Sequence, residues 1–159
     1  MLRDRIILFA TVVTMMITSP VTVVGEKMVI GYYPHWLKGN LPPEEIDLNI
    51  LTHIIHAFAW PNNDGTLSTY AGMIDPDLNY QVHLSGKQIL VSLGGWGNST
   101  GFADVTGNAS LRSSFISNIV KFIQQNDYDG VDIDWEYPST LADRENLTLF
   151  MSELRSALD

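Results

Sequence analysis

Four short apolar runs, separated by segments with helical periodicity, set the strongest constraint on the fold of this chain. The runs cover residues 28–33, 52–59, 87–93 and 130–136, and a proline or a glycine-rich turn follows each of them. Their length, β-branched content and boundaries favour strands over pieces of helix. Strands that alternate with amphipathic helices predict βα units and a parallel sheet.

The segments between the predicted strands carry the helical pattern. Apolar residues recur at helical spacing over residues 111–123 and again over 147–158. A shorter helix is predicted over residues 76–84. Residues 42–46, where two prolines precede two glutamates, have the composition of a helix start. The predicted fold class is therefore α/β.

The charge balance excludes several classes of protein. The chain has 9 Lys and Arg against 18 Asp and Glu, a net charge of −9. Binding to nucleic acid is not expected, because phosphate contacts need clustered basic side chains. The absence of cysteine excludes disulfide scaffolds, thiol catalysis and zinc–cysteine sites. With 45% hydrophobic residues, the composition is that of a globular chain with a core.

Residues 1–25 have the pattern of a secretory signal peptide. Two arginines precede an apolar stretch over residues 6–17, and small residues precede a cleavage point near Glu26. An uncleaved membrane anchor is the alternative, but the apolar stretch would rise only about 18 Å as a helix, against roughly 30 Å of hydrocarbon. We therefore predict secretion and no stable membrane insertion.

If the chain is exported, three sequons of the form Asn-X-Ser/Thr become candidate N-glycosylation sites. They begin at Asn98, Asn108 and Asn146. Each could carry an N-glycan in a eukaryotic secretory pathway. Such short patterns also arise by chance, so the sequence alone leaves their use open.

The fourth predicted strand carries three carboxylates on one face. Side chains alternate along a strand, so Asp132, Asp134 and Glu136 face one way and the apolar residues between them face the other. Their mutual repulsion predicts that one keeps a proton at neutral pH, or that a cation lies among them. Glu136 falls at the C-terminal end of the strand, where parallel α/β folds place active sites. A carboxyl with a raised pKa at that position is suited to general-acid catalysis.

Two other interpretations of these carboxylates remain open. They could form a solvated surface face, although the tryptophan and aliphatic residues between them count against it. They could also bind Mg²⁺ or Ca²⁺, but the spacing lacks the glycine of a calcium-binding loop. We therefore predict no metal site.

The segment DGVDIDWEYP at residues 129–138 resembles the D-x-x-D-x-D-x-E signature of the family 18 glycoside hydrolases, the chitinases and their relatives. The segment SLGGW at residues 92–96 is similar to that family's S-x-G-G motif on the third strand. Residues 31–34 and 52–58 resemble its first and second strands. The resemblance implies a (β/α)8 TIM barrel, of which residues 26–159 contain about the first four βα units, the N-terminal part of the catalytic domain.

The resemblance also implies roles for individual residues. Glu136 would protonate the glycosidic oxygen, and the substrate's own 2-acetamido oxygen would attack the anomeric carbon, since this family is a substrate-assisted exception to hydrolysis by two carboxylates. Asp134 would orient the acetamido group, Asp132 would share a proton with Asp134, and Asp129 completes the motif. The implied substrate-binding residues are Tyr32, Phe58, Ser92, Gly94, Gly95, Trp96 and Tyr137. For Tyr32 and Phe58, packing in the core is the open alternative.

The predicted function is that of a secreted chitinase that hydrolyses β-1,4 bonds between N-acetylglucosamine units with retention. Chitin or N-acetylglucosamine oligosaccharides are the implied partners, and no cofactor is implied. The alternatives are an endo-β-N-acetylglucosaminidase acting on N-glycans and a non-catalytic chitin-binding lectin of the same fold. A complete barrel needs about 250 residues. We therefore expect residues 26–159 alone neither to fold stably nor to hydrolyse chitin.

Overall fold

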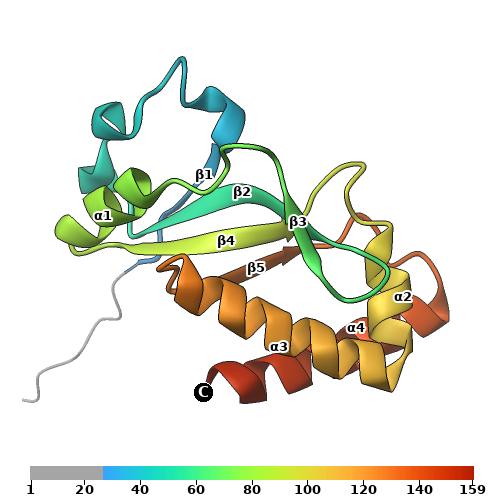
Figure 1. Cartoon of the computed structure of the whole chain (residues 1–159). Coiled ribbons are helices and arrows are strands. Elements are labelled where there is room, and N and C mark those ends of the chain that lie inside the picture. Colours follow the sequence, from blue (N-terminus) through green and yellow to red (C-terminus); the bar gives the residue numbers. More distant parts are fainter. Residues whose placement is uncertain (1–26) are drawn as a thin grey trace, which may run out of the picture.

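The structure is a computed structural model that describes residues 27–159 (Figure 1). The signal peptide predicted at residues 1–25 lies outside the described residues. Four strands pair in parallel, in the order of the chain: β1 (Ile30–Pro34), β2 (His53–Pro61), β4 (Gln88–Gly94) and β5 (Gly130–Asp134). Parallel neighbours in chain order, joined by helical connections, are the arrangement of consecutive βα units in a (β/α)8 barrel.

The helices in the described residues are α1 (Pro76–Leu84), α2 (Gly101–Gly107), α3 (Ala109–Gln125) and α4 (Leu141–Leu158). Three of them, α1, α3 and α4, fall on predicted helical segments, and α2 is additional. In Figure 1, α3 and α4 lie side by side below the sheet. Side-chain caps mark where the longer ones begin, since Asn108 accepts hydrogen bonds at the start of α3 and Thr140 forms a capping box with Asp143 at the start of α4.

Stacked aromatic rings join the sheet to the helices. The ring of Phe102 in α2 stacks on Trp135 with centroids 5.3 Å apart, and Phe115 in α3 stacks on Phe150 in α4 at 5.5 Å. The three phenylalanines are fully buried. This packing holds the segment that follows β5 against α2, which matters because the predicted general acid lies in that segment.

The outermost parallel strands each have an unpaired edge. Within residues 27–159, β1 pairs only with β2, and β5 pairs only with β4. Val29, Ile30 and Tyr32 are exposed along β1. In a closed barrel each strand has a neighbour on both sides, so these two edges are where a barrel would continue.

Several elements differ from the predictions. The helix start predicted at residues 42–46 is wrong, because the structure has only a 3-10 turn there, η2 (Pro43–Glu45), and Ile46 returns to extended backbone. Two more 3-10 turns, η1 (His35–Leu37) and η3 (Leu48–Ile50), complete the connection from β1 to β2. A short strand, β3 (Leu67–Thr69), pairs antiparallel with β2 and was not predicted, nor was α2.

The fourth predicted strand ends two residues early, at Asp134. Its partner β4 stops at Gly94. The backbone groups from the Asp134 carbonyl onward therefore hydrogen-bond to residues of the loop after β4. The carbonyl oxygen of Asp134 accepts from the backbone N–H of Gly95 at 2.8 Å, and the backbone N–H of Glu136 donates to the Ser99 hydroxyl at 2.9 Å. Glu136 therefore lies in the loop just beyond the strand.

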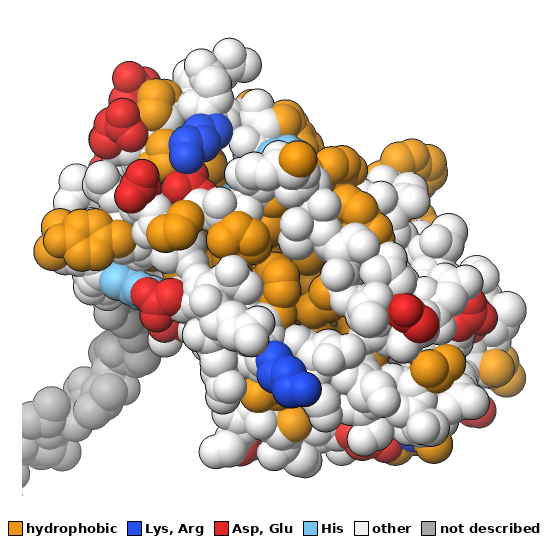
Figure 2. Space-filling view, viewed as in Figure 1, with side chains coloured by type: hydrophobic (Ala, Val, Ile, Leu, Met, Phe, Trp, Pro, Cys, Tyr) orange, Lys and Arg blue, Asp and Glu red, His pale blue; other side chains and the backbone are white. Residues whose placement is uncertain are grey.

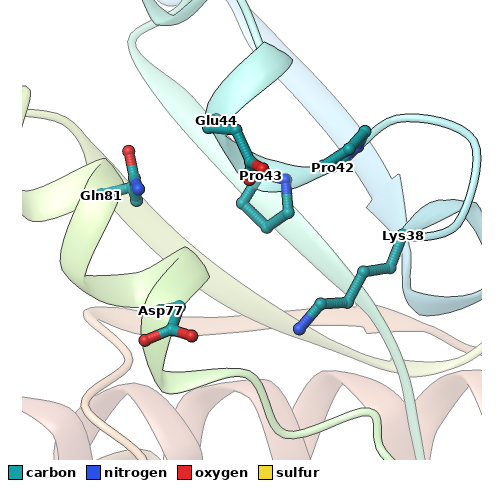
Figure 3. A pocket seen from close by; sticks show the side chains of 6 residues that line it. All are labelled: Lys38, Pro42, Pro43, Glu44, Asp77 and Gln81. Carbon is teal, nitrogen blue, oxygen red and sulfur yellow. The ribbon is translucent and has the colours of Figure 1, made fainter.

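An ion pair between the exposed Lys38 and the buried Asp75 fastens the loop after β1 to α1. Lys38 Nζ lies 2.6 Å from Asp75 Oδ2, and Asp75, which is only 4% exposed, also accepts from the backbone N–H of Leu78 at the start of α1. Figure 3 shows Lys38 reaching across a hollow of about 570 Å³ between the loop and α1. None of the predicted site residues lines this hollow. We therefore interpret it as part of the packing of the β1–β2 connection.

Histidine 56 is a core residue. It is buried in β2, and its Nδ1 lies 2.9 Å from the hydroxyl of Tyr128. Burial lowers the pKa of His56 to about 4, so the ring is neutral near physiological pH. No helix within residues 27–159 combines the length and the apolar character needed to cross a membrane.

Candidate active site

The carboxylate of Asp132 in β5 is held by two hydroxyl groups, one from the adjacent strand β4 and one from β1 at the far edge of the sheet. Tyr32 in β1 donates to Asp132 Oδ2 at 2.9 Å, and Ser92 in β4 donates to the same oxygen at 2.7 Å. These bonds reach across the open face of the sheet, opposite the face that packs on the helices. Burial and the bond to Asp132 raise the pKa of Tyr32 to about 12, so it stays a donor. Three of the predicted residues thus form one network.

Asp134 is the next residue on the same face. Burial raises the pKa of its carboxyl, and the negative charges of Glu136 and Asp132 raise it further. The sequence predicted repulsion among the three carboxylates. In the structure this repulsion raises the pKa of Asp134, the central one. A carboxyl in this setting keeps its proton to a higher pH than an exposed aspartate does.

We expect Asp134 to destabilise the folded protein at neutral pH. The pKa of its carboxyl is raised above its ordinary value of 3.8. The folded state therefore binds this proton more tightly than the unfolded state, and stability falls as the pH rises through the folded-state pKa. Asp134→Asn should raise the melting temperature at neutral pH and change it little below the ordinary pKa of aspartate.

This prediction is tested by thermal unfolding across a pH series. The protein for this test contains residues 27–159 joined to the second half of a related barrel; we call it the complete-barrel protein. Asp104→Asn, at an exposed position in α2, is the matched control. A melting temperature lowered by Asp134→Asn at neutral pH would contradict the assignment.

Ser99 ties the loop after β4 to the residues after β5. Its buried hydroxyl accepts from the backbone N–H of Glu136 and lies within hydrogen-bonding distance of the carbonyl oxygens of Gly95 and Asp134, at 3.1 and 3.2 Å. The peptide bond from Glu136 to Tyr137 is cis. Ser99 fixes the backbone that carries the predicted acid, a role that the sequence did not indicate.

An open hollow of about 220 Å³ lies beside Glu136. Ser99, Trp135, Glu136 and Tyr137 are among the residues that line it. The Tyr137 side chain is exposed, and the charge of Glu136 raises the pKa of its hydroxyl. Glu136 is thus partly open to solvent on the side of this hollow.

The two glycines of the third-strand motif allow the strands to approach closely. Gly94 has φ 115°, and a Cβ there would overlap the carbonyl oxygen of Asp134. Gly95 has φ 85° and packs against the ring of Phe58, 3.1 Å from where its Cβ would stand. Gly94 therefore allows the close approach of β4 to Asp134, and Gly95 packs against Phe58. Contact of either with substrate stays a prediction.

An aromatic cluster stands over the loops that follow β1 and β2. Tyr70 stacks on His35 with centroids 4.8 Å apart and meets the edge of Trp60 at 4.8 Å, and Trp36 lies 6.2 Å from Phe58. Figure 2 shows hydrophobic side chains gathered over this upper part of the molecule. Trp96, on the loop after β4, is 81% exposed. We call His35, Trp36, Phe58, Trp60 and Tyr70 the aromatic wall.

Four members of the aromatic wall, His35, Trp36, Trp60 and Tyr70, were not among the predicted site residues. Trp36 and Trp60 lie at the C-terminal ends of strands, and that position was the available signal. Tyr70 follows the short antiparallel strand β3, which the sequence did not predict. Among the described residues, no cluster of three His, Asp or Glu side chains has an arrangement suited to a metal ion.

Asp129, the first acidic residue of the motif, lies at the opposite end of β5 from the other three. Its Oδ2 accepts from the backbone N–H of Ile89 at 2.7 Å and lies 2.9 Å from Nε2 of His83. It joins the starts of β4 and β5 to α1. The four acidic positions of the motif therefore divide into one that fastens the sheet and three at the end that bears the site.

Comparison with known proteins places the chain in a family. Residues 28–159 match the family described as Glycosyl hydrolases family 18, and the chain belongs to this family. Its fold is that of a partial (β/α)8 barrel. It is 33% identical to "Probable chitinase 10" of Drosophila melanogaster over 71% of this chain and 6% of that protein. It is 30% identical to a "chitinase-like effector" of Moniliophthora perniciosa over 79% of this chain and 32% of that protein.

Solved chitinase structures have the same fold. A chitinase from Trichuris suis superposes with a TM-score of 0.74 at 35% identity, over 82% of this chain and 38% of that one. The Group IV chitinase of Ostrinia furnacalis, in complex with allosamidin, gives 0.76 at 26% identity, over 82% and 40%. A Cycas revoluta chitinase variant in complex with (GlcNAc)4 gives 0.73 at 27% identity, over 80% and 39%. The chain spans less than half the length of each of these proteins.

Proposed function

We propose that residues 27–159 carry the proton-donating part of a secreted chitinase that acts with retention and with help from its substrate. The observation that carries the proposal is the carboxylate series after β5. Glu136 lies open beside a hollow, Asp134 has a raised pKa, and two hydroxyls hold Asp132. Each carboxyl thus has a different environment. Different environments are needed if one group is to donate a proton while another stays charged.

In the first step, Glu136 donates a proton to the glycosidic oxygen while the C1–O bond breaks. The 2-acetamido oxygen of the same sugar attacks C1 and forms an oxazolinium ion. Asp134 accepts a hydrogen bond from the acetamido N–H and stabilises the positive charge that develops there. No second protein carboxylate is needed as a nucleophile.

In the second step, water attacks C1 and the oxazolinium ring opens. The Glu136 carboxylate, now without its proton, accepts one from that water. Two displacements on the same carbon return the original configuration, so the reaction retains it. Tyr32 and Ser92 hold the carboxylate of Asp132, and Asp132 would share a proton with Asp134.

The aromatic wall and Trp96 supply the binding surface. The exposed rings of Trp36, Tyr70 and Trp96 suit the apolar faces of sugar rings, which pack against flat aromatic side chains. The relatives crystallised with (GlcNAc)4 and allosamidin support an N-acetylglucosamine oligomer as the ligand of this chain too. The proposed partner is therefore chitin or its oligomers.

The proposal is tested with the complete-barrel protein and three ligands. Incubation with chitin oligomers should release shorter oligomers. Release of the glycan from an N-glycoprotein, with chitin oligomers left intact, would instead identify an endo-β-N-acetylglucosaminidase. Binding to chitin without any cleavage would identify a lectin. Secretion is tested separately, since the N-terminus of the exported chain should begin near Glu26 if residues 1–25 are removed.

A further inference from the structure

The three sequons lie in three different structural settings. Asn98 is in the loop between β4 and α2, Asn108 is the residue between α2 and α3, and Asn146 is inside α4. An N-glycan is attached through the side-chain nitrogen Nδ2 of asparagine. The three sequons therefore differ in whether, within residues 27–159, this nitrogen is free or already packed against other groups in the folded protein.

We propose that Asn108 is the N-glycan acceptor of this chain and that Asn98 and Asn146 are bare in the folded protein. Asn108 is exposed. It caps α3 through Oδ1, which accepts from the backbone N–H groups of Ser110 and Leu111 at 2.9 and 3.1 Å. Within residues 27–159 its Nδ2 donates to no protein group. A sugar on Nδ2 therefore leaves the cap intact.

At Asn98 the acceptor nitrogen is already in use. Its Nδ2 donates to the hydroxyl of Tyr70 at 2.9 Å, and the side chain is half-buried. Ser99, the middle residue of this sequon, is buried and bonded to the backbone of Glu136. A sugar here would push between the aromatic wall and the loop that supports the proposed acid.

At Asn146 the acceptor nitrogen faces the neighbouring helix. A Cβ placed on Gly107, at the end of α2, would lie 3.5 Å from Asn146 Nδ2. The side chain is half-buried, and α2 and α4 pack together along this side. A branched sugar on this nitrogen would have to part the two helices, at the cost of their packing.

The modification needs a lipid diphosphate-linked oligosaccharide as donor. The Asn108 amide nitrogen bonds to C1 of the first sugar, and the bond from C1 to the diphosphate oxygen breaks. The amide loses one proton, and the lipid diphosphate leaves. No oxidation or reduction takes place.

The test uses the complete-barrel protein, since residues 26–159 alone are not expected to fold, expressed in a glycosylating eukaryotic host behind a host leader peptide. Glycan release by a peptide N-glycosidase in heavy-oxygen water converts each occupied asparagine to a labelled aspartate, which peptide mass spectrometry locates. We expect the label at Asn108 in the soluble chain and none at Asn98 or Asn146. Ser110→Ala, which removes the sequon and keeps the Asn108 cap, should abolish the label. Thr100→Ala, which removes the Asn98 sequon, should leave it unchanged.

The readout is independent of catalysis and of the chain's own leader, so failure of the chitinase proposal would not affect it. Soluble and insoluble fractions are both analysed, with a secreted glycoprotein of the host as positive control. Label at Asn98 agrees with the proposal only in the insoluble fraction, because the aromatic wall is not formed in unfolded protein. Label at Asn98 or Asn146 in the soluble chain would overturn the proposal. An unlabelled Asn108 in both fractions would overturn it too.

Discussion

Replacing Glu136 with glutamine is expected to lower turnover of chitin oligomers by roughly two to four orders of magnitude, the range that a general acid contributes. The amide keeps the shape of the side chain and its place beside the hollow, but it has no acidic proton to give. Binding of the oligomer should stay within a few-fold of the original protein. The measurement is kcat for a chitin tetramer, together with its Kd by calorimetry, in the complete-barrel protein.

Glu145→Gln is the matched control, because Glu145 is an exposed glutamate on α4. It should leave both kcat and Kd unchanged. The assignment of Glu136 would fail if Glu136→Gln turned over the tetramer at the original rate. It would also be wrong if the loss lay entirely in Kd, since that would make Glu136 a binding residue.

The second large effect concerns the substrate. Glucose oligomers of the same length and linkage should be cleaved at no measurable rate, because they lack the acetamido oxygen that attacks C1. A well-placed intramolecular nucleophile can contribute about 7–11 kcal/mol to lowering the barrier. In the proposed mechanism no protein carboxylate takes the place of the acetamido oxygen. The measurement is product release by chromatography from matched chitin and cellulose oligomers.

A partly deacetylated chitin oligomer provides the internal control. Cleavage should occur only where the sugar on the non-reducing side of the broken bond is acetylated. Rapid cleavage of cellulose oligomers, or of bonds next to a deacetylated sugar on that side, would contradict substrate assistance. It would require a protein carboxylate as nucleophile instead.

Periodicity predicted the framework of this fold well. The strands fall where short β-branched runs meet a proline or glycine, and the face shared by Asp132 and Asp134 follows from the two-residue repeat. Predicting the end of β5 failed because strand length depends on the partner. β4 stops at Gly94, and no pattern in residues 130–136 contains that information.

The candidate site was predicted only in part, because some of its contacts join distant segments. The bonds from Tyr32 and Ser92 to Asp132 span 100 and 40 positions of the chain, so only the family resemblance pointed to those residues. The Asn98–Tyr70 bond, and with it the aromatic wall, depends on β3, which is too short to show a repeat. Ser99 could not be predicted from the sequence, because its hydroxyl contacts the backbone of Glu136 and of nearby residues, and such contacts leave no residue pattern.

The stereochemistry of the first product tests the central claim most directly. Proton NMR of a chitin oligomer freshly cleaved by the complete-barrel protein distinguishes the α and β anomers before mutarotation equilibrates them. Substrate assistance with Glu136 as the donor predicts that the new reducing end appears first as the β anomer. Initial appearance of the α anomer would mean direct attack by water and would contradict the mechanism proposed for this site.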